Sequence, residues 1–439
     1  MNPKLSFIVF LLLGSLYTTA QQNSPFSRYG LGESYPGQNI VIRGMGGIAS
    51  TYGTAQNVNF SNPASYSELK IVTYDIGLTL DSRTLTSINP IRKYNSVNLE
   101  PAYMALGMPL SKKHNLGLAF GLRPVTRIGY SISESRRTAS SGKDSMLYRY
   151  EGDGGLYQAF IGIGKRWGGL RIGLNTGYLF GNKNNTTRTI PVDSVNTYKS
   201  NSSTNTSYGS ILLNGGVQYD ISVNKTTSIR LGVSGNLQQN LSAKQSVLRE
   251  TFTYSSTGTD IPIDTVSLSP EVSGTIKLPA SYTAGISLNK SIVDAAGNKM
   301  DKSLIAVEYE STQWSNYRFF DQPDKFNNSW LVKVGGQLTP NPISIKSYWN
   351  RATYRAGFYY GQEALNADRN KLPVYAITLG VGLPVRRWSV YDNQLTIINT
   401  AFEIGKRGNK NNNISESFFR FSVGLNLGDI SWFRKRKYE

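Results

Sequence analysis

Residues Leu170–Phe180 read LRIGLNTGYLF, and the alternation in this stretch decides the fold. Side chains two positions apart lie on the same face of a β-strand, so the stretch predicts a strand with two unlike faces. One face is mostly apolar and the other mostly small or polar: Leu170, Ile172, Leu174, Thr176, Tyr178 and Phe180 against Arg171, Gly173, Asn175, Gly177 and Leu179. A soluble sandwich strand also alternates, but it usually places Lys, Glu and Thr on its outer face. Gly and Asn fit a crowded, wet lumen better, so the stretch predicts a lipid-facing barrel strand.

The same pattern recurs along the chain, for example in Asn115–Arg123, Tyr375–Leu383 and Phe419–Leu427. Counting such segments gives fourteen, and bacterial single-chain barrels have an even number of strands. We therefore predict an all-β fold, a transmembrane antiparallel β-barrel over residues 70–427, with an exported soluble β protein as the alternative. The strands are expected to start near Lys70, Leu99, Asn115, Gly155, Leu170, Tyr208, Ser228, Pro279, Ser303, Asn328, Thr353, Val374, Gln394 and Ser417.

Long and short connections mostly alternate between these segments. Barrels of this type have long extracellular loops and short periplasmic turns. We therefore expect both chain ends to be periplasmic and four long connections to form outer loops: Ser82–Asn98, Ser131–Asp153, Asn182–Ser207 and Gln238–Leu278.

The N-terminus predicts export. Met1–Ala20 contains Lys4, the apolar run Phe7–Leu13, and small residues suited to cleavage near Ala20. This is the layout of a secretory signal peptide, and the apolar run is shorter than the roughly 20 residues of a membrane anchor. The expected location is the bacterial outer membrane. Gln21–Leu69 is not strand-like, and we expect it to form a hatch that plugs the wide lumen.

The composition argues against several functions. The 439 residues include no cysteine and one histidine, His114, so no thiol nucleophile, thiolate metal site or histidine-based site is expected. We predict no enzyme activity, no metal and no cofactor. The formal net charge is +19, but the basic residues are scattered without a recognition fold, so no nucleic-acid partner is expected. Anionic outer-membrane lipid is the expected partner of Lys and Arg near the interfaces.

Four short motifs follow one another in the chain: Asn59–Ser65, Leu278–Gly285, Glu308–Ser315 and Tyr354–Tyr360. In this order they resemble the FadL-like family of outer-membrane transporters for long-chain fatty acids and other hydrophobic compounds. The resemblance implies a monomeric fourteen-strand barrel with an N-terminal hatch, which takes up a hydrophobic small molecule of the fatty acid or hydrocarbon class. The molecule then leaves sideways into the membrane through a gap at the third strand. Ser24–Gly30 resembles divergent members of the group from the Bacteroidota.

The third predicted strand contains Gly121, Arg123, Pro124 and Gly129. Proline has no N–H group, so it is confined to bulges, edges and strand ends. The resemblance implies that Pro124 marks the lateral gap and that the hatch motif Asn62, Pro63 and Ala64 faces it. The residues alone leave two alternatives: Pro124 lies above the membrane, and the hatch motif is a turn before the first strand.

The chain ends in a basic segment, residues 428–439, which contains Arg434, Lys435, Arg436 and Lys437. This periplasmic tail is either solvated or a docking element. Two functions therefore stay open. The chain is an outer-membrane channel for passive uptake of hydrophobic molecules, or a non-transporting barrel subunit of an envelope complex for protein secretion or outer-membrane assembly.

Overall fold

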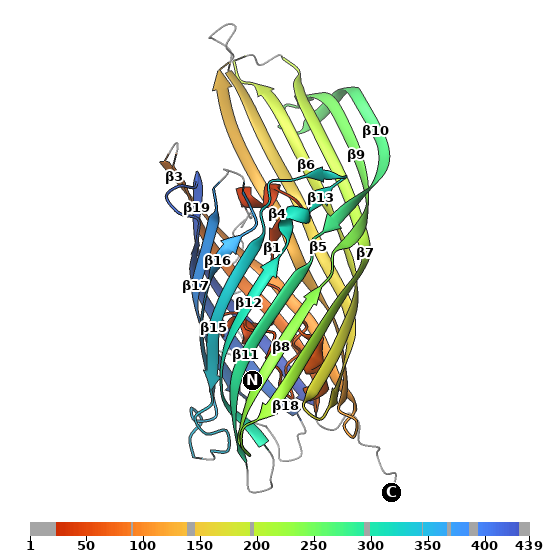
Figure 1. Ribbon diagram of the computed structural model, residues 1–439. Helices are drawn as coiled ribbons and strands as arrows, with labels where there is room; N and C mark the ends of the chain where they lie inside the picture. The colour runs from red at the N-terminus through yellow and green to blue at the C-terminus, as the bar shows by residue number, and fades with distance from the viewer. Residues whose placement is uncertain are drawn as a thin grey trace, which may run out of the picture.

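The computed structural model describes residues 23–88, 91–137, 145–193, 197–293, 299–344, 346–366, 370–385 and 394–429. The expected signal peptide and the basic tail Arg434–Lys437 lie outside these residues. Fourteen of the described strands form a closed antiparallel barrel, in which β8 pairs with β11 (Figure 1). The predicted fold class is confirmed. The barrel strands are β2 (Val72–Ile88), β3 (Ile91–Ser111), β4 (Leu116–Arg137), β5 (Ser145–Trp167), β6 (Leu170–Pro191), β7 (Lys199–Ser222), β8 (Thr227–Asn236), β11 (Ser281–Val293), β12 (Lys299–Thr312), β15 (Ser329–Leu338), β16 (Thr353–Glu363), β17 (Leu372–Pro384), β18 (Gln394–Arg407) and β19 (Ile414–Asp429).

The other elements lie inside the barrel or at its outer end. The N-terminal segment contains η1 (Pro25–Arg28), β1 (Glu33–Ser34), α2 (Ile40–Arg43) and η2 (Pro63–Glu68). A projecting arm is made of β9 (Gln239–Tyr254) and β10 (Asp260–Leu278), and η3 (Trp314–Asn316), β13 (Arg318–Phe319) and β14 (Gln322–Pro323) connect β12 to β15. Each of the fourteen segments expected from the sequence corresponds to one barrel strand.

The barrel wall has an apolar outer face and a small or polar inner face. Leu174, Ile305 and Ile404 point outward with 53%, 65% and 63% of their surface exposed, whereas inward-facing Asn175 and Thr378 are buried. A band of exposed Leu, Ile, Val and aromatic side chains is the surface that a membrane-spanning barrel presents to lipid. Of the helices in the described ranges, none has the length and apolar character to cross a membrane.

The four expected outer loops are largely strand, which corrects the sequence interpretation. The β2–β3 hairpin stays paired up to Ile88 and Ile91, and the β6–β7 ladder continues to Thr189 and Ser200. Beyond the membrane a strand has water on both sides, so the apolar alternation that marks strands is absent there. Backbone hydrogen bonds between Thr-, Ser- and Asn-rich strands extend the wall without that signal.

Residues 23–69 form the hatch, which lies inside the barrel (Figure 1) and is largely buried there. Its backbone and side chains pack directly against a ring of inward-facing glycines, which we name the glycine girdle. A Cβ atom added at any girdle glycine would come within 3.3 Å of a hatch atom. The remaining two strands, β12 and β18, place Ala306 and Ala401 against the hatch. The girdle consists of Gly77, Gly107, Gly117, Gly164, Gly173, Gly216, Gly232, Gly285, Gly335, Gly357, Gly380 and Gly424.

The girdle explains why glycine occurs so often at the inward-facing positions of the barrel strands. Several girdle residues are direct partners across neighbouring strands, such as Gly117 with Gly164 and Gly173 with Gly216. Glycine inside a strand weakens it, and it is tolerated where another backbone approaches closely. The hatch is therefore held around the circumference of the barrel.

Replacing Gly173 by alanine should destabilise the hatch, because the new methyl group would overlap the backbone of Pro63 and Ala64. Overpacking of this kind costs about 1–3 kcal/mol. The measurement is the temperature at which the folded barrel in detergent loses its compact electrophoretic mobility. Gly215→Ala is the matched control, because its methyl group would meet nothing within 4 Å. Equal midpoints for the two variants would contradict the close contact.

Candidate functional site

The barrel wall is interrupted between β3 and β4. Among the described residues, the two strands pair only from Met104↔Leu122 to Ser111↔Leu116. Beyond this point β3 stays paired with β2 and β4 stays paired with β5, so the two strands separate. Exposed Phe120 and Leu122 lie just below the separation, at the end of the apolar outer face of β4. We name this feature the β3–β4 break.

A proline lies on each side of the break. Pro124 is two residues beyond the last β4 pair, at a register shift in the β4–β5 ladder. The sequence placed Pro124 at a bulge, gap or strand end, and it lies at a bulge. Pro101 on β3 lies three residues beyond the last pair and beside a register shift with β2. Neither residue can donate a ladder hydrogen bond. The sequence analysis missed Pro101, although the same rule would have identified it.

Residues Asn23–Tyr35, which we name the strap, occupy the free edge of β4. Strand β1 pairs with β4 through Glu33↔Arg127 and Ser34↔Thr126 (Figure 1). The backbone N–H of Tyr35 donates to the carbonyl oxygen of Val125 at 2.9 Å. The strap therefore supplies hydrogen-bond partners that β3 would supply in a continuous wall.

The strap follows β4 further outward. The N–H of Ser24 donates to the carbonyl oxygen of Gly129 at 2.8 Å, and the N–H of Gly129 donates to Ser27 Oγ at 3.1 Å. The N–H of Ser131 donates to Asn23 Oδ1 at 3.0 Å. Gly129, which the sequence assigned to the gap strand, is therefore a strap contact.

Charged residues hold the strap from the lumen side. The carboxylate of Glu33 lies 2.7 Å from guanidinium nitrogens of both Arg83 and Arg407. Burial alone would raise the pKa of Glu33, but Arg407 and Arg83 hold it well below its ordinary value. Arg127 forms an ion pair with Glu100 of β3 and so bridges the break. Charge-assisted bonds of this type are stronger than neutral ones.

The other two predicted gap residues lie at the lower end of the break. Gly121 is paired with Ala105 in the last part of the β3–β4 ladder. Arg123 points inward, where its guanidinium donates to the carbonyl oxygen of Gly37 at 2.9 Å and to Gln158 at 2.9 Å. Arg123 therefore ties the beginning of the break to the hatch just after the strap.

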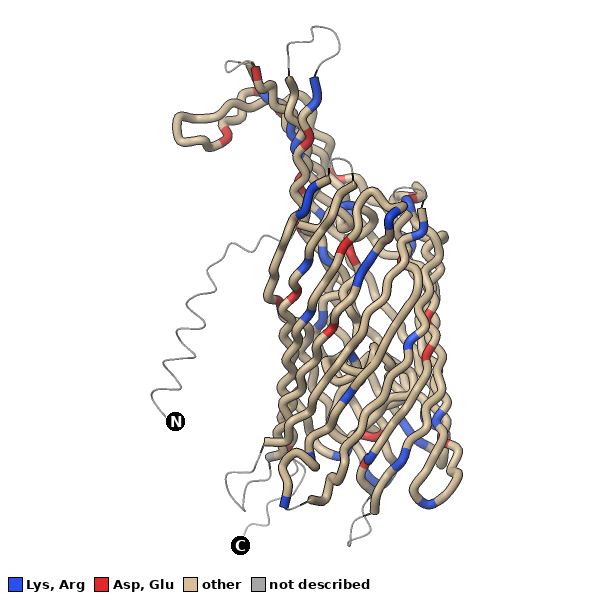
Figure 2. Tube along the Cα trace, turned by 90° about the vertical axis from the view of Figure 1, so that its left-hand side faces the viewer, with Lys and Arg blue, Asp and Glu red and all other residues tan. Residues whose placement is uncertain are grey.

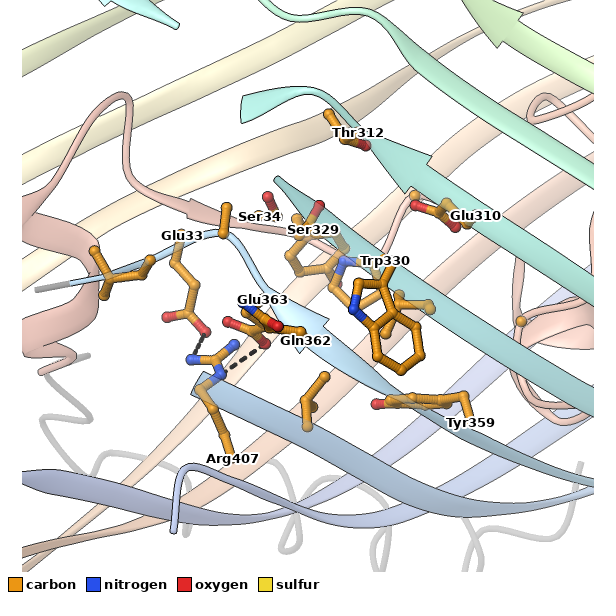
Figure 3. Close-up of a pocket in the computed structure, with 18 of the residues that line it drawn as sticks. Glu33, Ser34, Glu310, Thr312, Ser329, Trp330, Tyr359, Gln362, Glu363 and Arg407 are labelled. Carbon is orange, nitrogen blue, oxygen red and sulfur yellow. Dashed lines mark hydrogen bonds and ion pairs between the residues drawn. The ribbon is translucent and has the colours of Figure 1, made fainter. Parts of the chain in front are cut away.

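A pocket of about 290 Å³ lies behind the strap (Figure 3). One side is formed by the strap and hatch, Glu33–Gln38, and the other by strands β12 to β18. Trp314, Phe326, Trp330 and Tyr359 supply aromatic surface. Its charged side chains are largely paired, as the dashed contacts from Arg407 to Glu33 and Glu363 illustrate. Strap residues 33–35 line the pocket and also bond to β4, so the strap separates the pocket from the break.

The hatch motif does not face the break. The Asn62 amide donates to the carbonyl oxygens of Ser50 at 2.6 Å and of Val233 in β8 at 3.5 Å. Pro63 packs on girdle glycines of β5 and β6. Asn62 Oδ1 accepts from the N–H of Ala64 at 3.1 Å and caps η2, which leads into β2. The expectation that the motif faces the gap is therefore wrong, because this local cap directs it towards β5–β8.

Glu308 anchors the hatch to the wall. Its carboxylate accepts from the N–H groups of Ala49 and Ser50 at 2.8 and 2.6 Å. Lys333 lies 3.1 Å from Glu308 and 2.5 Å from Glu310. Glu308 and Glu310 lie on one strand face and, together with Lys333, form a lumen charge network.

His114 lies exposed in the turn between β3 and β4. Within the described ranges, no group of three or more His, Asp or Glu side chains has the arrangement of a metal site.

Oxidation should join Ser34→Cys to Thr126→Cys, because these residues are direct partners in an antiparallel pair and the natural chain has no cysteine. Antiparallel partners have Cα atoms roughly 4.5–5.5 Å apart, a spacing that a disulfide spans. The readout is a mobility shift after oxidation that a reductant reverses. Ser34→Cys with Ser210→Cys, three strands further round the wall, should stay unlinked. Failure of the first pair to link would place the strap elsewhere.

Glu308→Ala should be strongly destabilising, because it leaves two buried N–H groups of the hatch unpaired and removes the buried carboxylate partner of Lys333, which keeps only the more exposed Glu310. Removing one partner of a buried ion pair costs about 3–5 kcal/mol. Glu310→Ala, at a side chain that is 29% exposed, is the control and should lower the unfolding midpoint less. The reverse order would contradict the anchoring role of Glu308.

Comparison with solved structures identifies barrels of the same fold. The CymD monoaromatic hydrocarbon channel is 16% identical and superposes with a TM-score of 0.52, covering 91% of this chain and 98% of CymD. The Pseudomonas putida toluene transporter TodX is 15% identical with a TM-score of 0.53, over 91% of this chain and 98% of TodX. A Pseudomonas aeruginosa FadL homologue is 12% identical with a TM-score of 0.53, over 90% of this chain and 98% of the homologue. These likenesses confirm the fold that the resemblance implied.

A search of curated proteins gave no match to the chain. A family model described as BamG matches residues 1–439, which is the whole length of the sequence. The chain therefore belongs to the BamG family.

Proposed function

We propose that the chain is an outer-membrane channel for hydrophobic small molecules, which pass sideways between β3 and β4. The observation that carries the proposal is the spatial order of three features: the pocket, then the strap, then the β3–β4 break. The strap lines the pocket on one side and bonds the free edge of β4 on the other. Solved channels of this fold include a toluene transporter and a monoaromatic hydrocarbon channel.

The route follows from the fixed hatch. Because the girdle holds residues 23–69 around the circumference, an axial path would require many close backbone contacts to break. Release of the strap breaks the short β1–β4 pairing, its flanking hydrogen bonds and the ion pairs of Glu33 with Arg83 and Arg407, but it leaves the girdle contacts in place. Movement of the strap is therefore the less costly way to connect the pocket with the membrane.

The substrate class follows from the pocket lining. Aromatic side chains suit a fatty acid or a hydrocarbon, and about 290 Å³ holds one small molecule. The proposed organisation is a signal peptide cleaved near Ala20, a hatch over residues 21–69, a barrel over 70–427 and a periplasmic tail over 428–439.

The test uses a disulfide between the strap and β4, which we name the strap lock. Cells that carry Ser34→Cys with Thr126→Cys should take up labelled toluene and oleate only after reduction, because the disulfide keeps the strap on β4. Asn205→Cys with Ser246→Cys joins β7 to β9 without touching the strap and should leave uptake unchanged under both conditions. Equal uptake by the locked and reduced strap variant would contradict the lateral route.

The second candidate is a non-transporting barrel subunit of an envelope secretion or assembly complex. It is favoured by the buried ion-pair network of the lumen, in which Arg83, Arg407 and Arg420 engage carboxylates from the strap and four strands. Under this function the strap lock has no effect on cells. Depletion of the protein would instead lower the amounts of other outer-membrane barrels while toluene and oleate uptake stays unchanged.

A further inference from the structure

A second cavity, of about 620 Å³, lies on the opposite side of the hatch, at the turn end of the barrel. Hatch residues 52–55 and 67–70 form its inner surface. The ends of β3 and of β5 to β8, together with parts of β11, β12 and β15, form its sides. With the expected orientation, this cavity opens to the periplasm. We name it the vestibule.

The vestibule is lined by lysines that lack ion-pair partners. Lys70, Lys112, Lys225 and Lys290 are exposed lining residues. No described carboxylate lies within 4.0 Å of their amino groups. They come from four separate places: the hatch exit, the β3–β4 turn, the β7–β8 turn and the end of β11. Figure 2 shows Lys and Arg spread over the lower end of the barrel.

The vestibule carboxylates are mostly engaged by other groups. Glu68 lies 2.7 Å from Arg171 and 2.8 Å from Arg230, and Asp220 lies 2.5 and 2.7 Å from the same two arginines. Burial raises the pKa of Glu68, but Arg230 and Arg171 outweigh it and lower that pKa. Asp301 is the one further carboxylate among the lining residues. The positive charge of the four lysines is therefore not cancelled locally.

Arg171 is the most buried member of the ion-pair cluster at the vestibule, which also contains Glu68, Asp220 and Arg230. Its side chain is 1% exposed and lines the vestibule. Its Nε and Nη1 atoms have no hydrogen-bond partner among the described residues. Buried donors normally have partners, because an unpaired one costs free energy. Both atoms are themselves buried, so a ligand in the vestibule reaches them only if the neighbouring side chains move.

We infer that the vestibule binds an acidic peptide segment of a periplasmic partner. A concave cavity lined by one sign of charge concentrates the field and attracts ligands of the opposite sign. The four lysines come from separate elements around the cavity, a distribution that suits an extended segment whose several carboxylates reach them in turn. This inference is independent of uptake through the strap.

The test measures binding of a fluorescein-labelled ten-residue glutamate peptide to the purified full chain in neutral detergent. A ten-residue glutamine peptide is the control ligand. The glutamate peptide should bind and the glutamine peptide should not, and added salt should weaken binding because it screens charge. Replacing Lys70, Lys112, Lys225 and Lys290 by glutamine should reduce the affinity at least tenfold.

Two control variants locate the binding. One replaces four exposed lysines elsewhere on the described surface, Lys93, Lys244, Lys325 and Lys410, by glutamine. The other replaces Arg434–Lys437 of the basic tail. Both should keep the affinity within about twofold, and all variants should keep the unfolding midpoint of the natural chain. No binding by the natural chain, or an equal loss in either control variant, would overturn the inference, as would stronger competition by inorganic phosphate than by a second glutamate peptide.

Discussion

The close approach of two backbones determines the rest of this structure. The hatch touches the barrel wall where glycine or alanine leaves room, so the lumen is filled at one level and divided there. Because the wall has no side chain at the girdle glycines, the contacts there depend on shape, and a fully packed interior has few voids. The outer pocket and the vestibule are the spaces that remain above and below this level. Their separation is a consequence of the girdle rather than of the barrel itself.

The sequence predicted the barrel well because its signal is local. An apolar side chain at every second position marks a strand that has lipid on one side, and all fourteen such segments became strands. The outer extensions could not be predicted in this way. Asn184–Thr189 has no apolar alternation, yet it pairs with β7. There the strand is specified by hydrogen bonds to a neighbour, which leave no periodic pattern in the sequence.

The candidate site was only partly predictable, for a related reason. Pro124 was recognised because a proline restricts its own strand, and Pro101 carried the same signal unrecognised. The strap was not found, because contacts such as Ser24 with Gly129 join residues more than one hundred positions apart. The placement of Asn62 was wrong because the resemblance assigned it a role at the gap. The local alternative, a turn before the first strand, is closer to the cap that Asn62 forms.

The divided lumen also explains how one barrel can contain two cavities whose linings differ in charge and in aromatic content. The outer pocket contains aromatic groups and charges that are largely neutralised by ion pairs, so it offers little net attraction to an anion. The vestibule keeps four lysines without ion pairs behind the same hatch. A ligand that leaves sideways between β3 and β4 never meets those lysines, because the girdle closes the axial path. The two ends can therefore be altered independently, and a change at the strap has no direct contact through which to affect the vestibule.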